Sequence, residues 1–194
     1  MIESRDLLAL VRMILSDVRV DLTDEFHRNF ERQAFFNKAW QRRKGPIRAD
    51  RAILTDSGAL RKGIMSQSSD TAITFYSDLP YAEIHNTGGE ITVTAKMKRF
   101  FRAKFYEAQG GFERKEGGGT HRQPLSDRRF YAWTATMKLT PEAEFWRMLA
   151  MMPEGKVIKI PKRQFIGEHA KVKEIVQSII DDNLKEYFDK NLEI

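Results

Sequence analysis

The stretch YAEIHNTGGE (Tyr81–Glu90) lies where the predicted secondary structure of this 194-residue chain changes from helical to extended. It follows Pro80 and contains the pair Gly88–Gly89, and a proline before and a glycine after are typical of a short helical turn. Glycine allows the chain to turn into a following strand at no steric cost. EITVTA (90–95) has the alternating apolar residues of such a strand. We therefore predict a helical turn over 79–87, followed directly by a strand.

The same stretch raises the question of whether His85 takes part in chemistry. Glu83 precedes it by two residues, a spacing that puts both side chains on one face of a strand but points them apart on a helix. Neither arrangement forms HExxH, in which two histidines one turn apart bind the same metal. We interpret His85 as a structural residue that orders the turn through hydrogen bonds, and we expect Tyr81 and Ala82 to pack into the core. The other histidines stand alone in separate segments: His27, His121 and His169.

The composition is that of one soluble globular domain. Apolar residues make up 41% of the chain, charged residues make up 31%, and the mean hydropathy is −0.52. No apolar run approaches the roughly 18 residues that a membrane span needs. The N-terminus lacks the basic start and uninterrupted apolar core of a signal peptide, so we expect the protein to stay where it is made. Cysteine is absent, which excludes disulfides and thiolate-bound metals.

The formal net charge of +6 is concentrated in one part of the chain. Residues 91–140 contain eleven basic and four acidic residues, whereas the segments on either side are close to neutral. A basic patch attracts nucleic acid or an acidic partner, and it also keeps a protein soluble. The charge alone therefore does not decide between these roles.

Long helices are predicted at both ends of the chain. From Glu3 to about Phe36 apolar residues recur three and four apart, which indicates one bent helix or two consecutive ones. After Gly167 an apolar stripe with charges opposite predicts a C-terminal amphipathic helix. The second stripe consists of Val172, Ile175, Val176, Ile179, Ile180, Leu184, Tyr187 and Phe188.

The residues between these helices predict short strands. LRKGIMSQ (60–67) and TAITFYSD (71–78) flank a polar turn and indicate a β-hairpin. KVIKI (156–160) is a last strand that ends at Pro161, and QRRKGPIRADRA (41–52) is expected to be a loop. We therefore predict an α+β fold, in which a small, mostly antiparallel sheet is packed by N-terminal helices and a long C-terminal amphipathic helix.

Residues 1–194 are predicted to form a single domain that carries a basic, glycine-rich insertion at about 91–155. The insertion should begin with a helix, pass through a glycine-rich loop and continue with a helix that starts at Thr140. Its segment 96–106 interleaves basic and aromatic residues, an arrangement that binds nucleic acid when bases stack on the rings. At helical spacing the same rings pack inward while the basic groups reach solvent. We favour packing, because no specific nucleic-acid motif is present.

Four motifs, in this order, resemble the Mu-like phage virion morphogenesis family, the tail-completion proteins. They are AFFNKAWQRRKG (34–45), ILTDSGALRKGI (53–64), YAEIHNTGG (81–89) and IPKRQFIG (160–167), the last of which precedes the C-terminal helix. The pattern of that family falls on Trp40, Leu54, Gly58, Leu60, Tyr81, Ala82, His85, Gly88, Pro161, Arg163, Phe165 and Gly167. The segment between Glu90 and Gly155 matches no motif associated with the family.

The resemblance implies a structural protein of a tailed phage or prophage, not an enzyme, with no catalytic, metal-binding or cofactor-binding residue. Such proteins complete the tail or join it to the head, often as sixfold rings at the end of the tail tube. The expected partners are phage tail and head–tail connector proteins and further copies of the chain, with DNA contact left open and no membrane contact. The expected location is the virion, after assembly in the cytoplasm of the bacterial host.

Two alternatives to this function stay open. The first is a nucleic-acid-binding module that uses the basic aromatic segment 96–106. The second, which ranks lower, is a metal-dependent hydrolase that uses His85 and Glu83.

Overall fold

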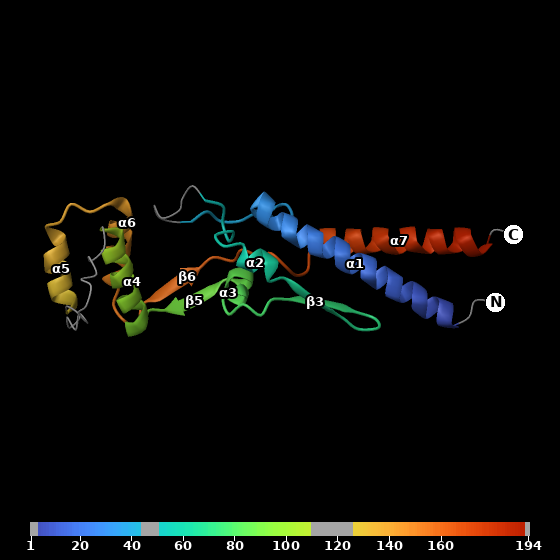
Figure 1. The fold of residues 1–194 in the computed structure, drawn as a ribbon, viewed down its shortest axis with the longest axis horizontal. Coiled ribbons are helices and arrows are strands. Elements are labelled where there is room, and N and C mark those ends of the chain that lie inside the picture. The colour runs from blue at the N-terminus through green and yellow to red at the C-terminus, as the bar shows by residue number, and fades with distance from the viewer. Residues whose placement is uncertain (1–3, 44–50, 110–125, 193–194) are drawn as a thin grey trace, which may run out of the picture. The chain divides into compact units, whose positions relative to one another are not determined.

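The computed structural model describes residues 4–43, 51–109 and 126–192, which belong to two compact units (Figure 1). Unit 1 comprises Met1–Arg42, Arg51–Gly89 and Ile160–Ile194, and unit 2 comprises Arg43–Asp50 and Glu90–Lys159. The predicted α+β class is confirmed, because within these ranges helices combine with three antiparallel two-stranded sheets. The predicted loop 41–52 falls mostly outside the described residues.

Two long helices form the larger part of unit 1. Helix α1 (Ser4–Arg32) is continuous. The predicted C-terminal amphipathic helix is present as α7 (Ala170–Leu192), and it packs against α1 (Figure 1). Asn183 of α7 donates from Nδ2 to Oδ2 of Asp17 on α1 over 3.1 Å. The core of the unit contains the predicted stripe of α1, in which Val18, Leu22, Phe26 and Phe30 are buried.

The prediction that the first helix reaches Phe36 is wrong for its last residues. The helix ends at Arg32, and strands β1 (Ala34–Phe35) and β2 (Lys38–Ala39) form a small antiparallel hairpin. Gln33 and Phe36 have φ values of +55° and +51°, which a continuing right-handed helix does not allow. The amide of Gln33 accounts for this change, because its Nε2 donates to the carbonyl of Ile53 over 3.2 Å and its Oε1 accepts from the Ile53 N–H.

The middle of unit 1 contains short elements: α2 (Ala59–Lys62), β3 (Met65–Ser68), β4 (Ile73–Tyr76) and α3 (Ala82–Thr87). The predicted hairpin is confirmed, and its register pairs Met65 with Tyr76. Its first strand begins at Met65, later than the pattern indicated, because Gly58 has φ +70° and the residues after it form α2 instead. The predicted helical turn is confirmed as α3, which Gly88 ends.

The described residues of unit 2 form three helices and a two-stranded antiparallel ribbon. Its elements are β5 (Gly89–Thr92, which begins in unit 1), α4 (Ala95–Ala108), α5 (Asp127–Ala135), α6 (Pro141–Ala150) and β6 (Val157–Ile160, which ends in unit 1). The predicted start of α6 is confirmed, because Thr140 Oγ1 accepts from the Ala143 N–H over 3.1 Å. Helix α5, which Ser126 caps, lies in a stretch for which no helix was predicted. Residues 110–125, most of the predicted glycine-rich loop, lie outside the described residues.

The aromatic residues of α4 divide between the core of unit 2 and its surface. Phe105 and Phe130 of α5 are fully buried, with ring centroids 5.2 Å apart and the rings edge to face. Phe101 is also buried, whereas Phe100 is 53% exposed. Tyr106, the fourth ring of α4, is partly buried against the same core. The predicted inward packing therefore holds for Phe101, Phe105 and Tyr106 and not for Phe100.

Two of the basic residues of α4 form ion pairs inside unit 2. Asp127, at the start of α5, accepts from the ammonium of Lys98 and from the guanidinium of Arg102. The Lys98 side chain is 8% exposed, and a cation so deeply buried requires a charged partner. Asp127 thus links α5 to α4 through two ion pairs. It neutralises two basic side chains that the sequence alone would place at the surface.

Acid should weaken unit 2 through Asp127. The hydrogen bond from Lys98, together with the charges of Lys98 and Arg102, holds the pKa of the Asp127 carboxyl below its ordinary value. A carboxyl with a lowered folded pKa contributes stability above its unfolded pKa, and this contribution is lost as the pH falls through the folded pKa. Below pH of about 4, the melting temperature of the wild-type chain should therefore fall more steeply than that of Asp127→Asn. Calorimetry of both proteins from acidic to neutral pH checks this, and parallel curves would contradict it.

Candidate functional site

The residues that carry the family resemblance all lie in unit 1, around the segment Ile160–Gly167. Trp40, which is 6% exposed, donates from Nε1 to the carbonyl of Gln164 over 2.7 Å. The ring of Phe30 lies between two of the motifs, with its centroid 5.4 Å from Trp40 and 5.5 Å from Phe165. The first and the last motif are therefore in contact, although 124 residues separate Trp40 from Gln164.

Arg163 connects the last motif to two others. Its side chain is buried, and its Nε donates to the carbonyl of Gln41 over 3.0 Å. Its backbone N–H donates to the carbonyl of His85 over 2.7 Å. A guanidinium held inside the fold by a carbonyl oxygen serves the architecture, because this donor is directed at the protein itself.

Two asparagines complete this set of contacts: Asn86, which lies within the motif YAEIHNTGG but is not one of its pattern residues, and Asn29, which lies outside the motifs. Asn86 Oδ1 accepts from the backbone N–H groups of Phe165 (2.8 Å) and Ile166 (3.2 Å). The fully buried Asn29 donates from Nδ2 to the Phe165 carbonyl over 3.2 Å and accepts at Oδ1 from the Phe36 N–H over 2.9 Å. The signal for Asn29 was its place beside Phe30 on the apolar face of a helix, where a buried amide needs partners.

Gly88 is required by a close approach of two backbone segments. Its φ and ψ of +76° and +171° lie in a region that essentially only glycine populates. A Cβ at this position would lie 2.9 Å from the Lys162 nitrogen and 3.2 Å from the Ile160 oxygen. Gly88 was predicted to turn the chain into the next strand. It has a second role, because its lack of a side chain leaves room for the backbone of the last motif.

The other motif residues differ in their surroundings. Leu60 and Ala82 belong to the buried core, and Leu54 packs against it with φ +62°. Tyr81 is 41% exposed, so the expectation that it packs into the core is wrong. Tyr81 immediately precedes α3, and its ring lies beside that of His85, with the two ring centroids 6.2 Å apart. Pro161 is half-buried, and Gly167 has φ +123°.

His85 takes part in the fold through its main chain. Its N–H donates to the Tyr81 carbonyl over 3.3 Å, and its carbonyl accepts from Arg163. His85 and Glu83 both lie on α3, where residues two apart diverge. Within the described ranges, no three His, Asp or Glu side chains lie close enough together to hold a metal ion.

The remaining histidines do not join His85. His169 stacks on Phe36 with ring centroids 4.7 Å apart, and its Nδ1 accepts from the Lys171 N–H over 3.1 Å at the start of α7. His27 lies on α1. His121 lies outside the described residues. Each described histidine therefore belongs to a separate local structure.

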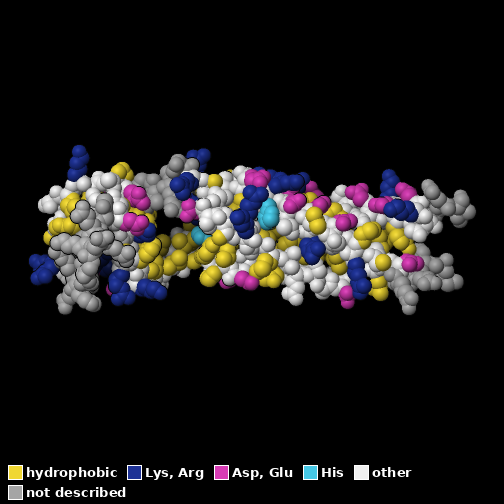
Figure 2. Space-filling model, viewed as in Figure 1, with side chains coloured by type: hydrophobic (Ala, Val, Ile, Leu, Met, Phe, Trp, Pro, Cys, Tyr) yellow, Lys and Arg dark blue, Asp and Glu magenta, His cyan; other side chains and the backbone are white. Residues whose placement is uncertain are grey.

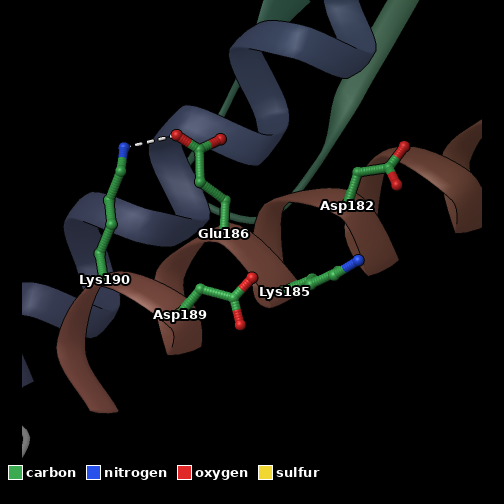
Figure 3. A pocket seen from close by; sticks show the side chains of 5 residues that line it. All are labelled: Asp182, Lys185, Glu186, Asp189 and Lys190. Atoms are coloured by element: carbon green, nitrogen blue, oxygen red, sulfur yellow. Dashed lines mark hydrogen bonds and ion pairs between the residues drawn. The ribbon is translucent and has the colours of Figure 1, made fainter. Parts of the chain in front are cut away.

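Five charged side chains line a shallow hollow on the exposed side of α7 (Figure 3): Asp182, Lys185, Glu186, Asp189 and Lys190. Lys190 Nζ and Glu186 Oε1 form an ion pair at 2.5 Å, and this hydrogen bond lowers the pKa of the Glu186 carboxyl. All five residues lie on one helix and face solvent, which is the ordinary surface of an amphipathic helix.

A larger open depression of about 820 Å³ lies in unit 2; we call it the unit 2 groove. Helices α5 and α6 and the turn after α6 contribute its lining residues: Tyr131, Pro141, Glu144, Phe145, Arg147, Met148, Met151, Met152, Pro153 and Lys156. The guanidinium of Arg147 is held over the Tyr131 ring at 5.2 Å and donates from Nε to Thr134 Oγ1 over 2.9 Å. The groove is thus apolar and methionine-rich, with two cations and one carboxylate among its residues.

No protein-family model, curated protein or solved structure matches this chain. None of the helices in the described ranges is both long enough and apolar enough to cross a membrane. The resemblance to the tail-completion family therefore rests on the four motifs themselves.

Gly88→Ala should destabilise unit 1 more than Gly58→Ala does. Both positions have a positive φ. Gly58 is in the left-handed helical region, where an alanine costs about 1–2 kcal/mol, and Gly88 is in a region that an alanine tolerates less well. At Gly58 the nearest atom to an added Cβ lies 4.0 Å away, whereas at Gly88 it is a backbone nitrogen at 2.9 Å. We expect the free energy of unfolding, measured in urea, to fall by about 2 kcal/mol more for Gly88→Ala. Equal losses at the two positions would show that the close approach is not what position 88 requires.

Proposed function

We propose that this chain is a structural protein of a tailed phage or prophage, which completes the tail or joins it to the head as a subunit of a ring at the tail end. The observation that best supports this proposal is the hydrogen bond between Trp40 Nε1 and the Gln164 carbonyl. It brings together the first and last motifs of the tail-completion pattern. Around it, Arg163 and Asn86 engage the backbone of the other motifs. In such a protein, the motif residues preserve the shape of a subunit.

The two-unit organisation is consistent with an assembly component. Unit 1 contains all twelve residues on which the family pattern falls, and unit 2 contains the basic insertion. A ring of identical subunits needs two different surfaces on each subunit, because its contacts run head to tail. In this proposal, unit 2 supplies a contact with a neighbouring copy, with a tail or connector protein or with the DNA passage. The subunits assemble in the host cytoplasm and become part of the virion.

Deletion of the gene from the phage or prophage that carries it should leave particles with unfinished or unattached tails. The physical reason is that a missing ring leaves the end of the tail tube without its joining surface. Electron microscopy of lysates and plaque counts measure this result. Complementation by the wild-type gene should restore intact virions, whereas Trp40→Ala, which removes both the ring packing and the hydrogen bond to Gln164, should not.

The matched control for complementation is Phe188→Ala, because Phe188 is 43% exposed on α7 of unit 1 and lies outside the motifs. His85→Ala adds a second control, directed at the hydrolase alternative. Full complementation by a folded His85→Ala protein would remove a catalytic role for this residue. Intact, infectious virions from the deletion phage would defeat the proposed function itself.

The ion pairs of α4 reduce the number of basic residues that could bind nucleic acid. Lys98 and Arg102 pair with Asp127, so neutralising them would disturb the fold as well as any binding surface. Lys96 and Arg99, by contrast, are exposed. In segment 96–106, these two residues could bind phosphates, and a base could stack on the exposed ring of Phe100.

If the chain binds DNA through α4, its affinity for random duplex should fall steeply with added salt, because each neutralised phosphate releases a counterion. The double variant Lys96→Ala/Arg99→Ala should then lower both the affinity and the salt slope, the latter by about 1.8 for two contacts. Fluorescence anisotropy with labelled duplex measures both quantities. Lys171→Ala/Lys173→Ala on α7 is the matched control. Unchanged binding in the α4 variant would reject this alternative.

A further inference from the structure

We infer that copies of this chain associate head to tail, with one face of α1 seated in the unit 2 groove of the next copy. The α1 face consists of Met13, Asp17, Val20 and Asp24, and we call it the α1 outer face. The inference rests on the proposed function, since it names the two surfaces that would form the contacts of the proposed ring.

The α1 outer face combines exposed apolar side chains with carboxylates. Its members are spaced four, three and four residues apart, which places them on one side of a helix. Met13 is 44% exposed and Val20 is 53% exposed, although other residues of the same helix, such as Val18 and Leu22, are buried in the core. Figure 2 shows apolar side chains open to solvent between charged ones on the face in view.

The unit 2 groove has the properties of a receptor for such a face. Its volume of about 820 Å³ lies in the range of preformed binding sites. Met148, Met151 and Met152 supply flexible, polarisable side chains, which adapt to an incoming apolar group. Met148 is 54% exposed, so the described residues leave it open to a partner. Arg147 is held in place by Thr134 and Tyr131.

The charges of the two surfaces are complementary. From Asp6 to Asp24, α1 carries four acidic and two basic residues. The described part of unit 2 (90–109 and 126–159) carries eleven basic and six acidic residues. On the α1 outer face, Asp17 lies between Met13 and Val20, and Asp24 lies one turn beyond Val20. Asp17 also accepts a hydrogen bond from Asn183 of α7. Arg147 and Lys156 border the groove, where they outnumber the one carboxylate, Glu144. Opposite charges of this kind steer two surfaces together and set their orientation.

A contact between two different surfaces leaves one surface of each copy unoccupied. After one copy has placed its α1 outer face in a neighbour, its own groove is still free for a third copy. Such heterologous contacts produce a ring when the rotation closes and a filament when it does not. A second copy of the chain is therefore the occupant that the charge pattern and the pair of unmatched apolar surfaces favour.

Val20→Asp and Met148→Asp test the two surfaces separately. Each variant forces a carboxylate into an apolar contact, which is unfavourable unless the charge is paired. We expect each to raise the dissociation constant for self-association, measured by analytical ultracentrifugation, by about tenfold or more. The matched controls are Leu8→Asp, which is exposed on α1 outside the outer face, and Phe100→Asp, which is exposed in unit 2 outside the groove. Circular dichroism establishes that all four variants fold.

A mixture of Val20→Asp and Met148→Asp gives the decisive result. The first protein keeps an intact groove and the second keeps an intact α1 outer face, so one contact can form and the mixture should produce a dimer that grows no further. A contact between identical surfaces would not be restored by mixing. A mixture that stays monomeric, controls that weaken association as much as the variants, or a wild-type chain that is monomeric at every concentration would overturn the inference.

The outcome also separates this inference from the proposed function. A monomeric wild-type chain that still complements tail assembly would defeat the inference alone. Self-association through these surfaces, in a phage whose gene deletion leaves virions intact, would defeat the proposed function alone. Binding of purified tail-tube protein to the groove of a monomeric chain, abolished by Met148→Asp, would identify a different occupant and overturn the inference.

Discussion

The last motif, Ile160–Gly167, runs through unit 1 with Arg163, Phe165 and Ile166 buried, and this passage constrains the packing of the whole unit. Phe165 is fully buried, and its segment lies after the end of β6, beyond the pairing of that strand. Side chains bind its peptide groups instead, since Asn86 accepts from two N–H groups, and Asn29 and Trp40 each donate to a carbonyl. A buried peptide group without a partner costs about 1–3 kcal/mol, so the loss of any one of these side chains would weaken the whole passage.

This constraint explains which residue types make up the motifs. Gly88 leaves room for the backbone of Lys162, and Arg163 reaches the carbonyl of Gln41. Trp40 fills space beside Phe30 while its N–H finds an acceptor in Gln164. These are the requirements of close packing between segments distant in the chain. The same contacts matter for the proposed assembly, because a subunit can form a defined interface only if its own shape is defined.

Unit 2 is stabilised by a core of its own. Phe105, Phe130 and the alanines of α6 pack together, and part of the basic charge of α4 is neutralised internally by Asp127. The positive charge of this region is therefore divided between the interior and the surface. The cations left on the surface and the methionines of the groove are the features on which the proposed contact with a neighbouring copy rests.

Features that depend on neighbouring residues could be predicted from the sequence. The apolar spacing indicated α7 and most of α1, the alternation around a polar turn indicated the β3–β4 hairpin, and Thr140 indicated the start of α6. Periodicity and capping act within a few residues, so they can be recognised without a tertiary structure. The same holds for the helical turn before Gly88 and for the short strand at 157–160.

Three features depend on contacts between distant residues and could not be predicted: the end of α1, the contacts between the motifs, and the ion pairs inside unit 2. Gln33 stops the helix because Ile53 binds its amide, and Asn29 is buried because it reaches Phe165, 136 residues away. Helix α5 is stabilised by the burial of Phe130 against α4. Such contacts join residues far apart in the chain, and no local pattern in the sequence specifies which of them meet.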